Sequence, residues 1–158
     1  MIDETDRKHL RRCVDLATTA LENGDEPFGS ILVSAEGDVL AEKLNQISDG
    51  DKTQHPEFAL ARWAGENMAP EEKSKATVYT SGEHCPMCAA AHGLAGLGRI
   101  VYASSSEQLA EWFDEMGIAG TPRAIGRPIQ EVIRDTTVDG PVSDLAEEVH
   151  QLQRQCHM

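Results

Sequence analysis

The feature that most constrains the fold is a strand–helix–strand pattern over residues 75–104. "KATVYTS" (75–81) and "RIVYAS" (99–104) are short apolar runs of the kind found in buried strands. Between them, residues 85–95 are apolar and helical in pattern. Two strands joined through a helix need a crossover connection, which places them parallel in one sheet. The segment therefore predicts a βαβ unit.

The flanking sequence adds further elements to this unit. Two short apolar runs at 28–34 and 38–44, joined by "AEGD", predict a β-hairpin. Residues 117–128 are loop-like, and the pattern of 129–135 is ambiguous. Helical spacing of apolar residues recurs over four more segments, 3–23, 55–68, 106–116 and 141–155. The order predicts one α/β domain spanning the 158 residues, with helices on both faces of one sheet.

The charge of the chain bears on its partners. The formal net charge is −13, and no basic tract is present that would neutralise the phosphates of a nucleic acid. No run approaches the ~18 apolar residues that span a bilayer, and the N-terminus has no apolar segment typical of a signal peptide. We therefore expect a cytoplasmic protein that binds neither membranes nor nucleic acid.

Two short motifs carry the ligands of a metal. Cys85 and Cys88 are three residues apart at the start of a helix, whose N-terminus favours thiolate. His55 begins another helix, and a histidine with two cysteines is a set of donors preferred by zinc. Three protein ligands leave the fourth position for water, as in catalytic zinc sites. Glu57, two residues from His55, is close enough to move a proton of that water.

Three other interpretations of these motifs are open at this point. His55 and Glu57 are compatible with an exposed helix start, because Pro56 suits the first helical position and glutamate suits the first turn. The cysteine pair is also compatible with a thiol–disulfide oxidoreductase. A structural zinc site would need a fourth protein ligand, for which His84 is the nearest candidate.

"HPE" (55–57) followed by "CPMC" (85–88) resembles the zinc-binding signature of the cytidine and deoxycytidylate deaminase superfamily. The resemblance spans about residues 5–115 and is greatest for the guanine deaminase and tRNA adenosine deaminase branch. It implies a three-layer α/β/α sandwich around a central five-stranded mixed sheet, usually in a homodimer. It is also carried by three longer stretches, at 27–45, 79–91 and 98–106.

The resemblance further implies a mechanism. His55, Cys85 and Cys88 would hold one Zn²⁺ per chain, and zinc-bound hydroxide would attack the amine-bearing carbon of a heterocycle. Glu57 would be the proton shuttle. The implied substrate is a small free nucleobase or related ring, of the guanine, cytosine or s-triazine type. Deamination of adenosine in tRNA is the alternative, which the net charge of −13 disfavours.

The resemblance also implies contacts to the substrate, and each candidate has a structural alternative. Asn45 would hydrogen-bond the base, or else satisfy its own turn. Phe28 would line the pocket against the ring, or else belong to the core. Asp114 would meet the substrate, or else be an ordinary acidic residue on a helix surface. Glu83 would touch the substrate, or else brace its loop.

Two residues depart from the pattern of the family. His84 stands where the family has proline before the first cysteine. Pro56 stands where the family mostly has alanine, and a proline has no backbone N–H to donate to a bound base. The segment 117–158 is less regular and ends in an amphipathic helix. By the resemblance this segment is a lid or swapped element over the site; the alternative is a helix that only packs on the fold.

Overall fold

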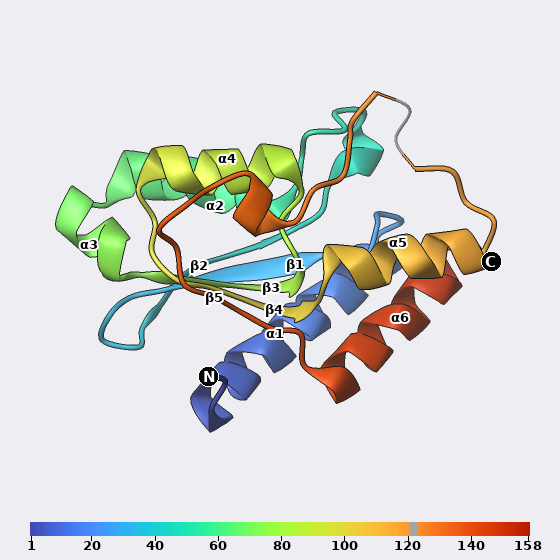
Figure 1. The fold of residues 1–158 in the computed structure, drawn as a ribbon, viewed down its shortest axis with the longest axis horizontal. Helices are drawn as coiled ribbons and strands as arrows, with labels where there is room; N and C mark the ends of the chain where they lie inside the picture. Colours follow the sequence, from blue (N-terminus) through green and yellow to red (C-terminus); the bar gives the residue numbers. More distant parts are fainter. Residues whose placement is uncertain (121–122) are drawn as a thin grey trace.

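The computed structural model describes residues 1–120 and 123–158. Its centre is a five-stranded sheet in the order β2-β1-β3-β4-β5 (Figure 1). β1 pairs antiparallel with both β2 and β3, whereas β3, β4 and β5 are parallel to one another, so the sheet is mixed. The predicted hairpin and the predicted parallel βαβ unit are both confirmed. The strands are β1 (Gly29–Val33), β2 (Val39–Leu44), β3 (Thr77–Gly82), β4 (Ile100–Ser104) and β5 (Val138–Asp139).

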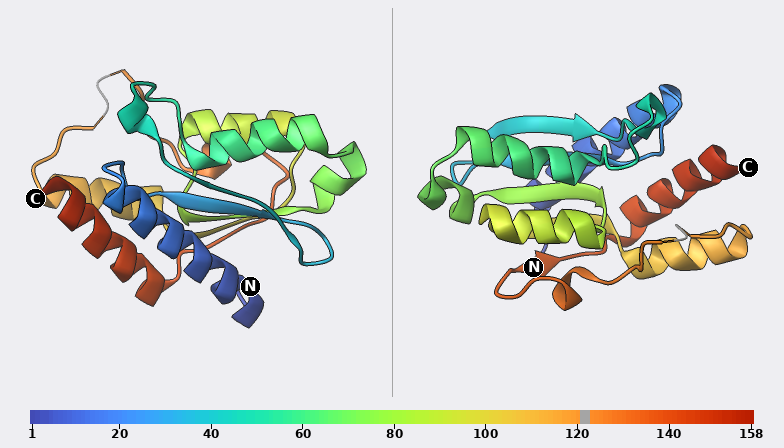
Figure 2. Two further views of the ribbon diagram at one scale, coloured as in Figure 1. Left: turned by 180° about the vertical axis from the view of Figure 1, so that it is seen from behind. Right: turned by 90° about the horizontal axis from the view of Figure 1, so that it is seen from above.

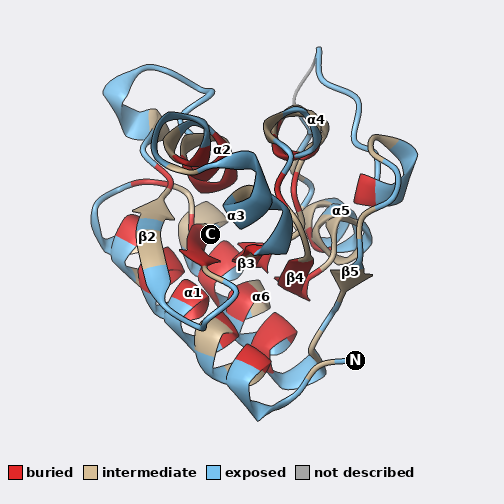
Figure 3. Ribbon diagram, turned by 90° about the vertical axis from the view of Figure 1, so that its left-hand side faces the viewer, coloured by how far each residue is buried: buried red, intermediate tan, exposed pale blue. Residues whose placement is uncertain are grey.

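Helices cover both faces of this sheet (Figures 1 and 3), which confirms the predicted three-layer α/β/α sandwich. One face carries α2 (Pro56–Asn67), α3 (Pro70–Lys75) and α4 (Pro86–Ala95). The opposite face carries α1 (Glu4–Glu22), α5 (Ser106–Glu115) and α6 (Ser143–His157). None of the helices in the described part of the chain combines the length and apolarity that a membrane crossing requires.

The alternation of side chains along the central strands divides the interior into two parts. Successive residues of a strand point to opposite faces of its sheet. On β1, Ile31 belongs to the apolar cluster under α1 and α6, whereas Leu32 belongs to the cluster under α2. On β3, Tyr79 and Val78 divide in the same way. Each face of the sheet therefore has its own packed core.

Two elements were not predicted from the sequence pattern. β5 has two residues, which is too short to show an alternation, and only its pairing with β4 makes it a strand. The "AP" at 69–70 predicts the end of a helix, but it separates two helices. Pro70 is the first residue of α3, a position where its missing N–H costs no hydrogen bond. The segment 129–135, left open above, contains a short 3₁₀ turn at Ile129–Glu131.

The C-terminal helix α6 packs beside α1 and against the sheet, on the face opposite α2 and α4 (Figure 2). Two ion pairs join the helices along their length, Arg7 to Asp144 and Arg11 to Glu148. Leu145 and Val149 of α6 are 1% exposed and lie in the core on that side. In this chain α6 thus contributes to the packing of the fold.

Candidate active site

The two predicted motifs meet at the N-termini of two helices. His55 is the residue just before α2 and Cys85 the residue just before α4, with Cys88 in the first turn of α4. The Sγ atoms of Cys85 and Cys88 lie 3.5 and 3.6 Å from Nδ1 of His55. Pro56 and Pro86 occupy the first helical positions, where proline is favoured, and so fix where each helix begins.

The electrostatics of the cluster favour one thiolate. The pKa of Cys85 is lowered to about 4, chiefly by the hydrogen bond from the Cys88 thiol and further by His55. The pKa of Cys88 is correspondingly raised, because its proton is shared with Cys85. The pKa of His55 is raised by its hydrogen bond to Cys85. Metal binding would displace these protons, since the metal needs thiolates and a neutral imidazole.

The donors present fit zinc. One ligand atom each from His55, Cys85 and Cys88 lies within 4.8 Å of the other two, and nitrogen with sulfur is the donor set that zinc prefers. Within the described residues this is the only such group of three, and it includes no fourth protein donor. The arrangement is that of a three-ligand site with one free position, rather than that of a closed structural site.

Glu57 is buried next to this cluster, with an exposed fraction of 6%. Its Oε1 lies 2.6 Å from Oγ1 of Thr80 and 3.1 Å from Oγ of Ser30. Burial raises the pKa of the Glu57 carboxyl, while the hydrogen bond from Thr80 opposes this shift. A carboxyl with a raised pKa is suited to take up and release a proton near neutral pH.

Ser30 and Thr80 were not predicted as site residues. Each is a fully buried polar residue inside a central strand, and both point to the face of the sheet that carries α2. The alternation of side chains along each strand could have found them. Ser30 is two residues from Leu32 and Thr80 is two residues from Val78, so each points to the same face as that buried apolar residue.

Asn45 and Phe28 lie side by side where β2 ends and β1 begins. The backbone N–H of Asn45 donates to the carbonyl of Phe28 at 3.0 Å. Asn45 is 1% exposed, and its side-chain Oδ1 accepts from the N–H of Ile47 at 3.1 Å. The Phe28 ring lies against the backbone of Gly82, in the segment that leads to Cys85. Asn45 therefore has the turn-forming role that was its structural alternative, and contact with a substrate stays a prediction for both.

Glu83 braces its loop. Its Oε1 accepts from the N–H and the hydroxyl of Ser106, at 2.9 and 3.1 Å, and its Oε2 accepts from the N–H of Ile129 at 2.8 Å. It thereby ties the segment before Cys85 to the start of α5 and to the chain that returns toward β5. Contact of Glu83 with a substrate stays a prediction.

Asp114 lies near the C-terminal end of α5, on the face of the sheet opposite α2 and α4, and its side chain is exposed. No hydrogen bond or ion pair described for the chain joins it to the cluster. The geometry favours the ordinary surface residue that was its alternative.

His84, the departure next to Cys85, is 1% exposed and stands edge-on to His92, with ring centroids 5.4 Å apart. Burial lowers the pKa of His84 well below its ordinary value, and His92 lowers it further. Neither ring nitrogen of His84 has a hydrogen-bond partner among the described residues. The imidazole is therefore neutral and packs under α4 instead of joining the donors.

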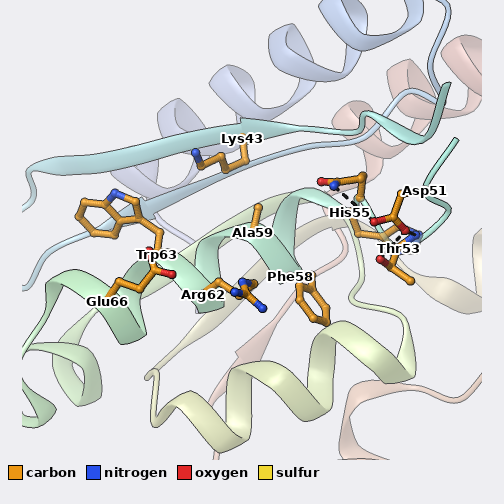
Figure 4. A pocket seen from close by; sticks show the side chains of 10 residues that line it. Lys43, Asp51, Thr53, His55, Phe58, Ala59, Arg62, Trp63 and Glu66 are labelled. Carbon is orange, nitrogen blue, oxygen red and sulfur yellow. Dashed lines mark hydrogen bonds between the residues drawn. The ribbon is translucent and has the colours of Figure 1, made fainter. Parts of the chain in front are cut away.

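A surface groove of about 460 Å³ runs along α2 from His55, bordered by the edge strand β2 (Figure 4). Phe58 and Trp63 give it apolar walls, and Lys43 and Arg62 give it cationic ones. Of the metal cluster only His55 lines this groove, which otherwise follows the outer surface of α2.

The fold and the donors place the chain in a class of α/β/α proteins in which a histidine and two cysteines could hold one metal ion. The particular family follows from comparison with known proteins. A model of the cytidine and deoxycytidylate deaminase zinc-binding region matches residues 3–104, and the chain belongs to this family. It is thus a deaminase of the cytidine deaminase-like fold, as the sequence predicted.

Three similar proteins are named for different activities. A probable cytosine deaminase of Schizosaccharomyces pombe is 32% identical over 116 residues, covering 73% of this chain and 70% of that protein. Guanine deaminase of Bacillus subtilis is 32% identical over 125 residues, covering 77% and 78%. A solved structure from a study of tRNA A34 deaminases has a TM-score of 0.63 at 25% identity, covering 92% of this chain and 99% of that one.

Proposed function

We propose that this chain is a zinc-dependent aminohydrolase of a small free heterocyclic base. The observation that carries the proposal is the convergence of His55, Cys85 and Cys88 from two helix starts beside the buried carboxyl of Glu57. Those residues would hold one zinc ion, which supplies an activated water at neutral pH. A thiol–disulfide role for the cysteines leaves both His55 and Glu57 without a function.

The residues of the chain would divide the chemistry between them. Glu57 would accept a proton from the attacking water and pass it to the ring nitrogen next to the reacting carbon. It would then take the remaining proton of the added hydroxyl and give it to the amino group, which leaves as ammonia while the carbonyl forms. Phe28 and Asn45 would hold the ring at the strand ends above Gly82. Pro56 has no N–H, so that any substrate must bind without a backbone hydrogen bond at this position.

The names of similar proteins and the net charge of the chain support a small substrate that is not a polyanion. Two similar proteins are named for the free bases cytosine and guanine. A net charge of −13 opposes the approach of a polyanion, because affinity for nucleic acid draws on Lys and Arg at phosphates. Cytosine, guanine and s-triazine rings therefore form the proposed class.

Deamination of adenosine in tRNA is the second candidate, favoured by the solved tRNA deaminase structure that matches over 92% of this chain. One assay separates the two. Release of ammonia is measured from guanine, cytosine, azacytosine, ammeline, adenine and the matching nucleosides, and inosine formation is measured in tRNA. We expect turnover of at least one free base and none of tRNA; inosine in tRNA without turnover of any base would refute the proposal.

We propose that the enzyme is a homodimer that pairs through the surface of α2 and α4. α4 carries no Asp, Glu, Lys or Arg, and its Leu94 is 90% exposed, so this surface escapes the repulsion that the overall charge imposes. On the neighbouring α2, Arg62 and Glu66 are one turn apart and would pair crosswise about a two-fold axis. Leu94→Glu should give a monomer by light scattering, and Ile125→Glu, a control at an exposed loop residue, should not. A dimer that survives Leu94→Glu would exclude this interface.

A further inference from the structure

Two hydroxyl groups lie inside the sheet directly beneath Glu57. Ser30 of β1 and Thr80 of β3 are opposite each other in the antiparallel ladder, and both are fully buried. Their neighbours on the same face are apolar, namely Leu32 and Val78. A buried hydroxyl costs free energy unless it is hydrogen-bonded, so two of them in a strand interior need a reason.

The three groups form a chain of hydrogen bonds. Ser30 Oγ lies 2.8 Å from Thr80 Oγ1, and Thr80 Oγ1 lies 2.6 Å from Oε1 of Glu57. Each hydroxyl has a single proton. The shortest distances therefore indicate that the Ser30 hydroxyl donates to Thr80 Oγ1 and that the Thr80 hydroxyl donates to the carboxylate. When Glu57 does not take it, the Thr80 proton has a second acceptor, the carbonyl of Gly82 at 2.9 Å.

Both hydroxyl contacts reach the same oxygen of Glu57. Ser30 Oγ is also 3.1 Å from Oε1, and neither hydroxyl of the sheet bonds Oε2. The carboxylate lies beside the Cys88 thiol and so borders the metal cluster. The two carboxylate oxygens therefore have different surroundings. Oε1 is held by the hydroxyls of the sheet, and Oε2 is left for whatever binds at the cluster.

We propose that Thr80, supported by Ser30, is a positioning residue that holds Oε1 of Glu57 and leaves Oε2 to carry the proton in deamination. The inference rests on the proposed function for its catalytic meaning. A charge-assisted hydrogen bond of 2.6 Å is a strong one, and it comes from a strand instead of a mobile loop. The sheet thereby restricts the rotation of the Glu57 carboxylate, which its own helix α2 would leave free.

The kinetic test compares Thr80→Val, which keeps the shape but removes the hydroxyl, with Thr80→Ser, which restores it. For Thr80→Val we expect a loss of about 10- to 100-fold in kcat with KM changed by less than about threefold, as for a misplaced catalytic group. Thr80→Ser should recover kcat to within about threefold, and Ser30→Ala should lose less than Thr80→Val. Thr77→Val, on the same strand but outside this chain of bonds, is the matched control. Wild-type kcat in Thr80→Val, or an equal loss in Thr77→Val, would overturn the proposal.

A second measurement does not depend on turnover. Crystal structures of the metal-free wild type, Thr80→Val and Thr80→Ser report the orientation of Glu57 directly. We expect Oε1 at hydrogen-bond distance from the hydroxyl in the wild type and in Thr80→Ser, and a rotated or multiply oriented carboxylate in Thr80→Val. The same single orientation in Thr80→Val would contradict the inference. If the wild type deaminates nothing, the proposed function fails, while this result still decides what orients Glu57.

Discussion

The two faces of the sheet differ in where their buried polar side chains lie. Under α1, α5 and α6 the core cluster is apolar, from Leu10 through Val101 to Leu145, and the buried polar side chains Asp6 and Gln153 of these helices lie on the face opposite the metal cluster. Charged residues pair across the outer helix surfaces. Under α2 and α4 the strands also bury Ser30 and Thr80, next to Glu57. Both faces thus bury polar groups, but only those under α2 and α4 contact Glu57 and border the metal cluster.

Substitutions on the two faces should therefore have different effects. A substitution on the α1/α6 face should lower the free energy of unfolding and leave the turnover of the folded protein unchanged. A substitution at the cluster should abolish turnover and leave the fold intact. The predictions below test this separation, beginning with the largest expected effect.

Cys88→Ala should lose zinc and activity together, because two protein ligands are too few to retain the metal. The matched control is Cys13→Ala, which removes another fully buried thiol, on the α1 side of the sheet. This control should keep its metal and its turnover. Metal content by mass spectrometry and ammonia release check both variants. Full zinc with full turnover in Cys88→Ala would remove Cys88 from the site.

Glu57→Gln keeps the shape of the side chain but cannot move a proton. We expect normal zinc content and a loss in kcat of at least ~10²- to 10⁴-fold, the range of general acid–base catalysis. Glu148→Gln on α6, which removes the partner of Arg11, should retain wild-type kcat. Loss of zinc from Glu57→Gln would instead make Glu57 a ligand and refute the role proposed for it.

Leu145→Ala truncates a side chain of α6 that is 1% exposed in the opposite core. Removing a buried leucine typically costs about 2–5 kcal/mol of stability. Thermal and urea unfolding should show this loss, with turnover per folded molecule unchanged. If α6 acted as a lid over the site, turnover of the folded enzyme would fall instead, and the division between the two faces would be wrong for this helix.

The smallest effect that we expect is the dependence of stability on pH that Asp6 contributes. Burial alone would raise its pKa, but hydrogen bonds from Arg99 and Tyr79 outweigh burial and lower it to about 2, from 3.8. Because the pKa in the folded state is depressed, the contribution to stability is present above pH ~5 and is lost as the pH falls toward 2. It amounts to about 2 kcal/mol.

Asp6→Asn tests this contribution by urea unfolding between pH 7 and 2. The difference in unfolding free energy between wild type and variant should be constant down to pH ~5 and then shrink. Asp114→Asn, at an exposed carboxylate, should behave like the wild type. A wild-type–variant difference that does not change with pH would show that the Arg99 pairing does not set the titration of Asp6.

The sequence predicted those parts of the molecule that local patterns and short motifs encode. The hairpin and the parallel βαβ unit follow from patterns within single segments. The donors lie in two short motifs, 55–57 and 85–88, which the family resemblance joined. β5 was missed, since two residues form a strand only through their partner β4.

The interior of the site was harder to predict for a related reason. Ser30 and Thr80 acquire their role only when β1 and β3 pair and α2 brings Glu57 above them. Asp114 was placed by resemblance alone, and the packing of α5 leaves its side chain exposed. Short motifs thus predicted the metal ligands. The residues that support Glu57 could not be predicted in this way, because their role depends on tertiary contacts.

Removal and return of the metal test the central claim most directly. The purified protein is analysed for zinc, stripped with a chelator, and reconstituted, with ammonia release from the best free base followed at each step. We predict about one zinc per chain, no turnover after stripping, and recovery on addition of zinc. A protein that holds no zinc and has two titratable thiols at Cys85 and Cys88, or whose turnover survives complete stripping, would contradict the account.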